Sequence, residues 1–413
     1  MEMMGELSVV AMATGTKCVG EKDRGMFVVS DSHAEVLSLR LFRLFLLYEM
    51  SGCGEGCLVR DGDKFIVRPG VSFHFYSSCV MCGDATICIP LPCNTTCDNN
   101  TYHEKLREQS NSGLKRPPTS PSAPSAKQIK PDKVALSSSP TAPLSKQLKP
   151  DKAALPSSPA APLSKHPQSG DMTRSGGKCL LSDDLTADSI QTRSWSVTSV
   201  LRTKPGRGPL SLSLSCSDKL MKRQSLGLQG GLLAGLIPNP IRFKCIVIGG
   251  NFSINSVKRA LFARLPEQFQ FEADVISAKD LFLNSFENCT SRLLNNAPVS
   301  ASSTSLLWCR GGAPCQWSAV KGRLQGATKT SAEEKVMLPV CRANMFKFAK
   351  SVAEVLIPGN EYNVNESGQE HDMRDEYENF KKLSPYREKK NQFCAHFMGW
   401  KRKKERGKIV KFS

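Results

Sequence analysis

The sequence DSHAEVLSLRLFRLFLLYEM, residues 31–50, decides the fold. Nearly every position from residue 34 to residue 48 is apolar, without the alternation of apolar and polar positions that a half-buried strand shows. This length and pattern predict a helix that is buried on most of its faces. Asp31 and Ser32 precede it as candidate N-caps, and Glu35 falls in its first turn.

Strand-like segments surround this helix in the sequence. Four short segments before residue 80 have the composition of strands: residues 7–11, 26–30, 64–68 and 71–77. Residues 243–248 (FKCIVI) predict a buried strand, and two glycines follow it. Helical spacing occurs in three later segments: residues 255–265, 342–357 and 372–400, the last with one or two helices. The pattern predicts an α/β fold with a C-terminal helical extension.

A long segment of different composition interrupts the pattern. Residues 98–194 contain a tandem repeat, KQIKPDKVALSSSPTAPLS followed by KQLKPDKAALPSSPAAPLS, in which fifteen of nineteen positions are identical. The repeats lack aromatic residues and carry several prolines each, so they have little apolar surface to bury. We therefore expect a disordered insertion between two halves of one domain, residues 1–97 and residues 195–413, the second ending in a basic tail.

Composition restricts the partners and the compartment. The 413 residues carry a formal net charge of +18, which favours a polyanionic partner: nucleic acid first, and a membrane surface or a phosphorylated small molecule second. Sixteen cysteines are scattered along the chain, unlike the framework of a small secreted protein. Without a signal peptide or a long apolar run, we expect a cytoplasmic or nuclear protein that is neither secreted nor in a membrane. The sequence indicates no protein partner.

Three short elements carry residues suited to zinc chemistry: His33-Ala34-Glu35, Cys82-Gly83-Asp84-Ala85 and Ser215-Cys216-Ser217-Asp218-Lys219. One imidazole and two thiolates fill three corners of a zinc tetrahedron and leave the fourth for water. A carboxylate beside the metal that does not bind it can carry a proton, and His-x-Glu with cysteines is the signature of zinc deaminases. Because His33 and Glu35 lie at a helix N-terminus, both can point to the same site.

A second thiol competes for the third ligand position. Cys79 and Cys82 form a Cys-x-x-Cys pair, which is itself a metal-ligand spacing. The ligand set is therefore His33 and Cys82 with either Cys216 or Cys79, and we favour Cys216.

The combined motifs resemble the family of adenosine deaminases that act on RNA. The family's order is kept in residues 14–18 (TGTKC), 31–35 (DSHAE), 202–208 (RTKPGRG), 215–219 (SCSDK) and 226–230 (LGLQG). The resemblance implies a cytidine-deaminase-like mixed sheet flanked by helices, with His33, Cys82 and Cys216 on zinc and Glu35 as the proton shuttle. It also implies that Thr16 and Lys17 approach an adenosine flipped out of its helix.

Two features favour the tRNA branch of this family. No double-stranded-RNA-binding module precedes the deaminase region, and the loop at residues 204–208 resembles that of the tRNA enzymes. The expected substrate is then the adenosine immediately 3′ of the anticodon in alanine tRNA. The alternatives are a catalytically inactive RNA-binding relative, an editor of double-stranded RNA and, given the charge, least of all a free-nucleoside deaminase.

The resemblance also implies a buried inositol hexakisphosphate, whose many phosphate oxygens require inward-pointing cations. The matching positions are Arg40, Lys204, Lys219, Lys222, Gln229, Lys381 and Trp400, with Tyr377 in the same C-terminal motif. Several positions depart from the family pattern, among them Ser30, where asparagine is usual, and Met81, where a proline precedes the zinc cysteine. Leu39 stands where a second arginine is usual, and Arg223 stands in place of a tryptophan.

Overall fold

The structure is a computed structural model. It describes residues 1–20, 23–52, 54, 56–87, 179–180, 197–204, 213–250, 252–281, 302–311, 315–327, 333–356, 370–397 and 400. These residues belong to one compact unit assembled from residues 1–90 and 172–413. The predicted insertion lies outside the described residues except for Cys179–Leu180, and the basic tail lies outside them as well.

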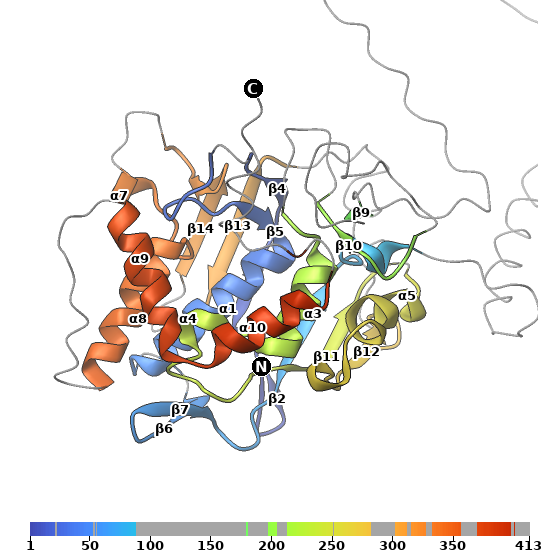
Figure 1. Ribbon diagram of the computed structural model, residues 1–413, viewed down its shortest axis with the longest axis horizontal. Helices are drawn as coiled ribbons and strands as arrows, with labels where there is room; N and C mark the ends of the chain where they lie inside the picture. The colour runs from blue at the N-terminus through green and yellow to red at the C-terminus, as the bar shows by residue number, and fades with distance from the viewer. Residues whose placement is uncertain are drawn as a thin grey trace, which may run out of the picture. The chain divides into compact units, whose positions relative to one another are not determined.

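Helix α1 (Ala34–Met50) is the centre of the domain and confirms the predicted helix. Its first turns follow strand β5 (Asp31–His33), and it packs against strands β3 (Ala11–Ala13) and β13 (Thr304–Cys309). Leu37, Leu41, Leu46 and Leu47 have no exposed surface, as an almost wholly apolar sequence requires. Figure 1 shows α1 in the middle of the molecule, between strands and the other helices.

Two sheets frame this helix. Strands β8 (Phe73–Ser77), β11 (Phe243–Ile248) and β12 (Asp274–Ser277) form a parallel sheet with β11 in the middle. The antiparallel sheet has the order β15-β14-β13-β3, where β14 is Cys315–Val320 and β15 is Arg323–Leu324. The fold is thus a mixed α/β domain, as the sequence predicts, and β8 and β11 match the strands expected at residues 71–77 and 243–248.

Two-stranded ribbons make up the remaining strands. The pairs are β1 (Glu2–Met3) with β2 (Glu6–Leu7), β4 (Thr16–Cys18) with β5, β6 (Leu58–Asp61) with β7 (Lys64–Val67), and β9 (Cys179–Leu180) with β10 (Leu201–Arg202). All four pairings are antiparallel. Strand β7 confirms the strand expected at residues 64–68.

Three local predictions are wrong. Residues 26–30 are mostly buried but form no strand: the Val29 N–H donates to the Gly322 carbonyl, the Met26 carbonyl accepts from the start of helix α8 (Arg342–Leu356), and the Ser30 carbonyl accepts from Val19 just after β4. Residues 7–11 divide between the end of β2 and the start of β3. Asp31 and Ser32 lie in β5 and not at the helix cap, which is His33.

The remaining helices pack around α1 and the two sheets. They are η2 (Asp84–Thr86), α3 (Cys216–Leu226), α4 (Gly230–Leu233), α5 (Ile254–Lys258), η3 (Arg259–Ala263), η4 (Glu267–Phe269), α7 (Glu333–Val336), α8 (Arg342–Leu356), α9 (Glu370–Phe380), η5 (Lys381–Leu383) and α10 (Tyr386–Ala395). The α5–η3, α8 and α9–α10 segments confirm the three predicted helical regions.

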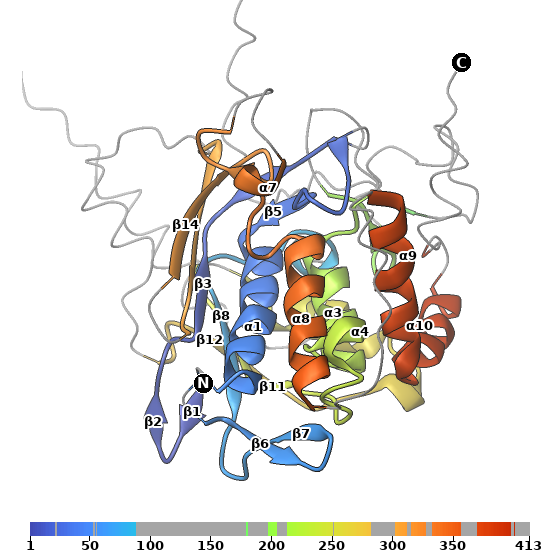
Figure 2. The same cartoon turned by 90° about the vertical axis from the view of Figure 1, so that its left-hand side faces the viewer.

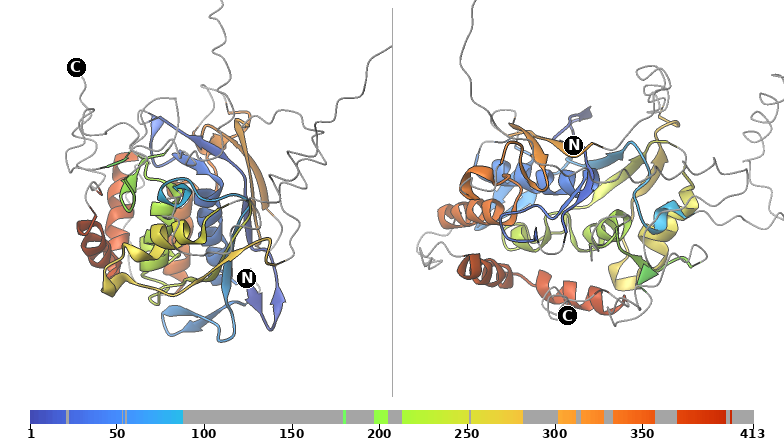
Figure 3. Two further views of the ribbon diagram at one scale, coloured as in Figure 1. Left: turned by 90° about the vertical axis from the view of Figure 1, so that its right-hand side faces the viewer. Right: turned by 90° about the horizontal axis from the view of Figure 1, so that it is seen from above.

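The helices stack in layers. Figure 2 shows the antiparallel strands, then α1, then α8 with α3 and α4, and last α9 and α10. Figure 3, seen from above, has the C-terminal helices in red along one side of the domain. Helices α1, α3 and α10 carry the cationic residues that are described below. Among the described helices, none combines the length and the apolar character that a membrane crossing requires.

Candidate active site

His33 is held at the junction of β5 and α1. It is the N-cap residue of α1, with extended backbone, and it is buried. In the antiparallel pairing Thr16 lies opposite His33, and Lys17 lies opposite Ser32. Gly15 makes this approach possible, because a Cβ atom there would lie 2.1 Å from the Ser32 carbonyl oxygen. Thr16 and Lys17 are exposed, so their side chains are accessible next to the candidate ligand.

Cys82 and Cys216 meet although 134 positions separate them. The Cys216 backbone N–H, in the first turn of α3, donates to Cys82 Sγ over 3.3 Å, and the Ser217 N–H donates to the Cys82 carbonyl over 3.1 Å. Gly83 has a φ of 115°, and a Cβ atom there would lie 2.2 Å from Ser215 Oγ. The Cys-Gly sequence is therefore needed for the loop to reach the start of α3.

Lys204 connects these thiols to His33. Its ammonium group lies 2.5 Å from Cys216 Sγ and 3.6 Å from Cys82 Sγ. It also lies 3.5 Å from an oxygen of Asp31, whose other oxygen is 2.9 Å from His33 Nδ1. Three distant segments of the chain thus meet around one buried lysine.

Asp31 is the counter-charge of this region. Its carboxylate also accepts hydrogen bonds from the ammonium group of Lys219 and, over 3.2 Å, from Ser213 Oγ. Burial raises the pKa of Asp31, but Lys219, the His33 hydrogen bond and Lys204 together hold that pKa well below its usual value. We call this group the Asp31 network; its members are Asp31, His33, Cys82, Lys204, Cys216 and Lys219.

The two thiols differ in acidity. The hydrogen bond from Cys216 is the largest influence on Cys82 and, with Lys204 and His33, lowers the pKa of Cys82 to about 6 against the effect of burial. Burial and the neighbouring Cys82 raise the pKa of Cys216 well above its usual value. For Lys204, burial lowers the pKa, but Cys216, Asp31, Cys82 and Glu35 raise it above its ordinary value. The region therefore favours one thiolate and one ammonium group.

Glu35 lies in the first turn of α1, two residues after His33. Its carboxylate is close enough to raise the pKa values of both Cys216 and Lys204. Its charge therefore acts on two groups of the region around Cys82.

The structure adds a thiol that the sequence did not indicate. Cys18 Sγ lies 3.6 Å from His33 Nδ1 and 3.4 Å from Asp31, and the donor atoms of these three residues all lie within 4.8 Å of one another. Burial and then Asp31 raise the pKa of Cys18 to about 12, so this thiol keeps its proton. Cys18 lies close to His33 because strand β4 pairs with strand β5. The spacing of the cysteines along the sequence does not predict this pairing.

The position of Cys79 bears on the alternative ligand set. Cys79 is exposed, whereas Cys216 is buried and bonds to Cys82 through its backbone. His33 Nδ1 is occupied by Asp31, so Nε2 is the nitrogen left for a metal; a carboxylate behind the imidazole is the usual support of a histidine ligand. This geometry favours Cys216 over Cys79 as the thiol that accompanies Cys82, whereas the described donor atoms that lie within 4.8 Å of those of His33 belong to Cys18 and Asp31.

The residues predicted to bind inositol phosphate divide into two groups. Lys204 and Lys219 belong to the Asp31 network, whereas Lys222 Nζ lies 4.8 Å from the centre of the Trp400 ring and Lys381 Nζ lies 4.5 Å from the Tyr377 ring. The amide of Gln229 is already used by the backbone: its Nε2 donates to the carbonyls of residues 237 and 239, and its Oε1 accepts from the N–H of residue 241.

Additional cations surround this second group. We define the cationic cluster by five residues: Arg40, Arg43, Lys222, Arg223 and Lys390. Burial is the largest cause that lowers the pKa of Arg40 (to about 10), Arg43, Lys222 and Lys390, and neighbouring cations lower it further. Within the part of the chain that the structure describes, none of the five forms an ion pair with a carboxylate. Sequence reasoning had found only Arg40 and Lys222.

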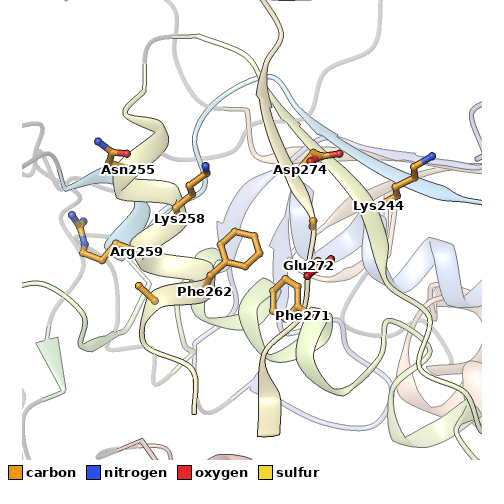
Figure 4. Close-up of a pocket in the computed structure, with 10 residues that line it drawn as sticks. Lys244, Asn255, Lys258, Arg259, Phe262, Phe271, Glu272 and Asp274 are labelled. Carbon is orange, nitrogen blue, oxygen red and sulfur yellow. The ribbon is translucent and has the colours of Figure 1, made fainter. Parts of the chain in front are cut away.

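A separate surface pocket of about 820 Å³ lies beside α5 and the segment before β12 (Figure 4). Its lining includes Lys244, Lys258 and the ring pair Phe262–Phe271, whose centroids are 4.9 Å apart. Arg259 on the same wall bonds to Asp84, two residues after Cys82. The pocket contains none of the predicted site residues.

Comparison with known proteins gives a consistent result. A family model of the adenosine-deaminase (editase) domain matches residues 11–404. tRNA-specific adenosine deaminase 1 of Mus musculus is 28% identical, with 95% of this chain and 83% of the mouse protein aligned. The Homo sapiens protein of the same name is 29% identical over 78% of this chain and 72% of its own length. The double-stranded RNA-specific editase Adar of Drosophila melanogaster is 25% identical over 64% of this chain and 30% of its own length.

Proposed function

Because the chain belongs to the adenosine-deaminase (editase) domain family and is a hydrolytic adenosine deaminase, we propose that its substrate is adenosine in tRNA. The alignments with relatives named tRNA-specific adenosine deaminase 1 support this, since they extend over more of the chain than the alignment with the double-stranded RNA editase. The net charge of +18 suits a polyanionic substrate. By resemblance to the tRNA branch, the target is the adenosine immediately 3′ of the anticodon of alanine tRNA.

The residues that would hold a catalytic zinc ion are His33, Cys82 and Cys216. One observation carries this assignment: three segments of the chain meet at Lys204. The ammonium group of Lys204 lies within 3.6 Å of both thiols and of the Asp31 carboxylate, which binds the His33 ring. An imidazole and two thiolates are a donor set that zinc prefers and that leaves one position open. A zinc ion bound there lowers the pKa of its water to about 7.

Glu35 is the proposed proton carrier. The reaction adds water to C6 of adenine, breaks the bond from C6 to the amino nitrogen and releases ammonia, so one proton must pass from the water to the leaving nitrogen. Glu35 is the candidate for this task because it lies two residues after His33 in the first turn of α1 and its charge raises the pKa values of Cys216 and Lys204. Asp31 fixes the orientation of the His33 ring, and Thr16 and Lys17 are exposed where the flipped nucleotide enters.

We also propose inositol hexakisphosphate as a structural ligand of the cationic cluster. Half-buried cations that crowd together without carboxylate partners among the described residues repel one another, so such a group favours binding of an anion. Arg40, Lys222, Lys381 and Trp400 suit this ligand, whereas Gln229 has both of its N–H donors engaged by carbonyl groups. A cytoplasmic or nuclear location remains a prediction from the sequence.

Inosine formation on alanine tRNA tests the proposed function. The purified chain is expected to convert the adenosine next to the anticodon, and Glu35→Gln is expected to slow the reaction by about 10²- to 10⁴-fold while zinc and tRNA still bind. Glu267→Gln, on a helix remote in sequence from the site, is the matched control. Turnover on duplex RNA but not on tRNA would favour the double-stranded editor, and binding of zinc and tRNA without turnover would favour the inactive relative.

A further inference from the structure

Arg223 is the electrostatic centre of the cationic cluster. Its guanidinium, on α3, lowers the pKa of each of the other four members: Arg40, Arg43, Lys222 and Lys390. In the described part of the chain its one hydrogen bond is donated to the Tyr386 hydroxyl over 3.1 Å. A cation close to four others raises the electrostatic energy of the protein alone, and a bound partner of opposite charge would lower it.

Arg43 reaches the same place from α1. It lies one turn after Arg40, and its Nε donates to the Leu228 carbonyl over 2.8 Å. Burial is the largest cause of its lowered pKa, followed by Arg223 and Arg40. A Cβ atom on Gly230 would lie 2.3 Å from Arg223 Nη1 and 3.5 Å from Arg43 Nε. The two guanidinium groups therefore converge on one glycine, which leaves room for both.

Most hydrogen-bond donors of these two arginines remain available. A guanidinium group has five N–H donors, and within the described residues each of the two donates one hydrogen bond to the protein. Planar guanidinium groups bind phosphate in a bidentate manner, which an aliphatic or an aromatic side chain cannot do. The resemblance assigns neither residue: it gives a tryptophan at position 223 and an arginine at position 39, where this chain has a buried leucine.

We propose that Arg43 and Arg223 are phosphate ligands particular to this chain, and that they replace the arginine absent at Leu39 and the aromatic side chain absent at position 223. This inference rests on the proposed inositol hexakisphosphate site. Phosphate ligands and residues that merely pack in the core differ in what their removal does to the anion-free protein. Removing one of these charges should weaken binding of the polyphosphate and, because the other cations then repel less, stabilise the anion-free protein.

The test compares the full chain with three variants, Arg43→Leu, Arg223→Leu and Arg223→Trp. Each protein is unfolded, freed of bound anions and refolded with or without inositol hexakisphosphate; bound phosphate per chain and urea unfolding are then measured. Each substitution should weaken polyphosphate binding by about tenfold or more. In the absence of the ligand the variants should refold at least as well as the parent chain. Arg242→Leu is the control, since this exposed arginine also bonds to a carbonyl oxygen.

The outcomes separate the two proposals. If the parent chain binds no inositol hexakisphosphate, the proposed ligand is wrong and this inference falls with it. If the parent binds it and the variants bind it equally well, only the assignment of Arg43 and Arg223 is overturned. Loss of stability both with and without the ligand would also overturn it, because that result indicates ordinary packing. Equal stabilisation by inorganic pyrophosphate at matched phosphate concentration would contradict a site built for the inositol ring.

Discussion

The Asp31 network and the cationic cluster are two polar regions of the same domain that balance charge in opposite ways. In the network, Asp31 lies within 3.5 Å of Lys204 and also pairs with Lys219, and the thiols provide further negative charge. In the cluster, five cations gather without a carboxylate pair among the described residues, and the pKa values of Arg40, Arg43, Lys222 and Lys390 are lowered, whereas that of Lys204 in the network is raised.

The difference teaches what each region requires from outside. A buried charge with an internal partner is tolerated, whereas a group of like charges is tolerated only with an external counter-ion. The two regions are in contact electrostatically, since Lys219 of the network is among the cations that lower the pKa of Lys222 in the cluster. An anion in the cluster would therefore also reduce the repulsion felt by the network.

The largest expected effect on the free energy of unfolding comes from removing the carboxylate of the Asp31 network, which leaves its lysines without a counter-charge, as in the cationic cluster. Asp31→Asn removes the one carboxylate that pairs with Lys204 and Lys219, and leaves both ammonium groups without it. Breaking a buried pair in this way costs about 3–5 kcal/mol, which urea unfolding measures directly. Asp63→Asn removes an exposed ion pair with Lys64 and should change stability little. Equal effects of the two substitutions would contradict the role given to Asp31.

The next effect concerns the counter-ion of the cluster. Inositol hexakisphosphate added at about one hundred times its dissociation constant should stabilise the folded chain by about 2.7 kcal/mol, because the ligand binds only the folded state. Melting temperature with and without the ligand is the measurement. An unchanged melting temperature in protein shown to be anion-free would mean that the cluster needs no such ligand.

The smallest effect is the dependence of stability on pH. The pKa values of Lys222 and Lys390 are lowered in the folded protein from the ordinary 10.5, so the unfolded chain binds more protons. Stability of the anion-free protein should therefore rise with pH as these lysines lose their charge, up to the ordinary lysine pKa, by about 1.4 kcal/mol for each unit of pKa difference. Urea unfolding between about pH 7 and pH 10 checks this sign. A fall over that range would contradict the cluster's repulsion.

Much of the fold was predictable because its signals are local. The apolar run at residues 34–48 predicted α1, and the FKCIVI segment predicted β11. Residues 26–30 gave a false strand because burial alone does not distinguish a strand from an irregular segment that bonds to loops. The caps failed for a similar reason, since pairing with β4 draws Asp31 and Ser32 into a strand.

The site was predictable only where a motif carries it. His33, Glu35, Cys82 and Cys216 belong to short recognisable motifs. The structure brings Cys82 and Cys216 together beside Lys204, and their sharing of one zinc ion with His33, next to Glu35, stays a prediction. Cys18 stands in the TGTKC motif, but its place beside His33 follows only from the pairing of β4 with β5; Arg43 belongs to no motif and gains its neighbours from the approach of α3. In the sequence Arg43 is one of several polar positions in a largely apolar helix, and that pattern does not distinguish an isolated surface residue from a member of a cluster.

The metal content of four cysteine variants tests the central claim most directly, namely that one zinc ion joins three distant segments. Zinc per chain is measured in Cys82→Ser, Cys216→Ser, Cys79→Ser and Cys18→Ser, with thermal melting to verify that each variant folds. We predict that zinc is lost from the Cys82 and Cys216 variants and kept in the other two. Zinc kept in Cys216→Ser but lost from Cys79→Ser or Cys18→Ser would contradict the proposed ligand set.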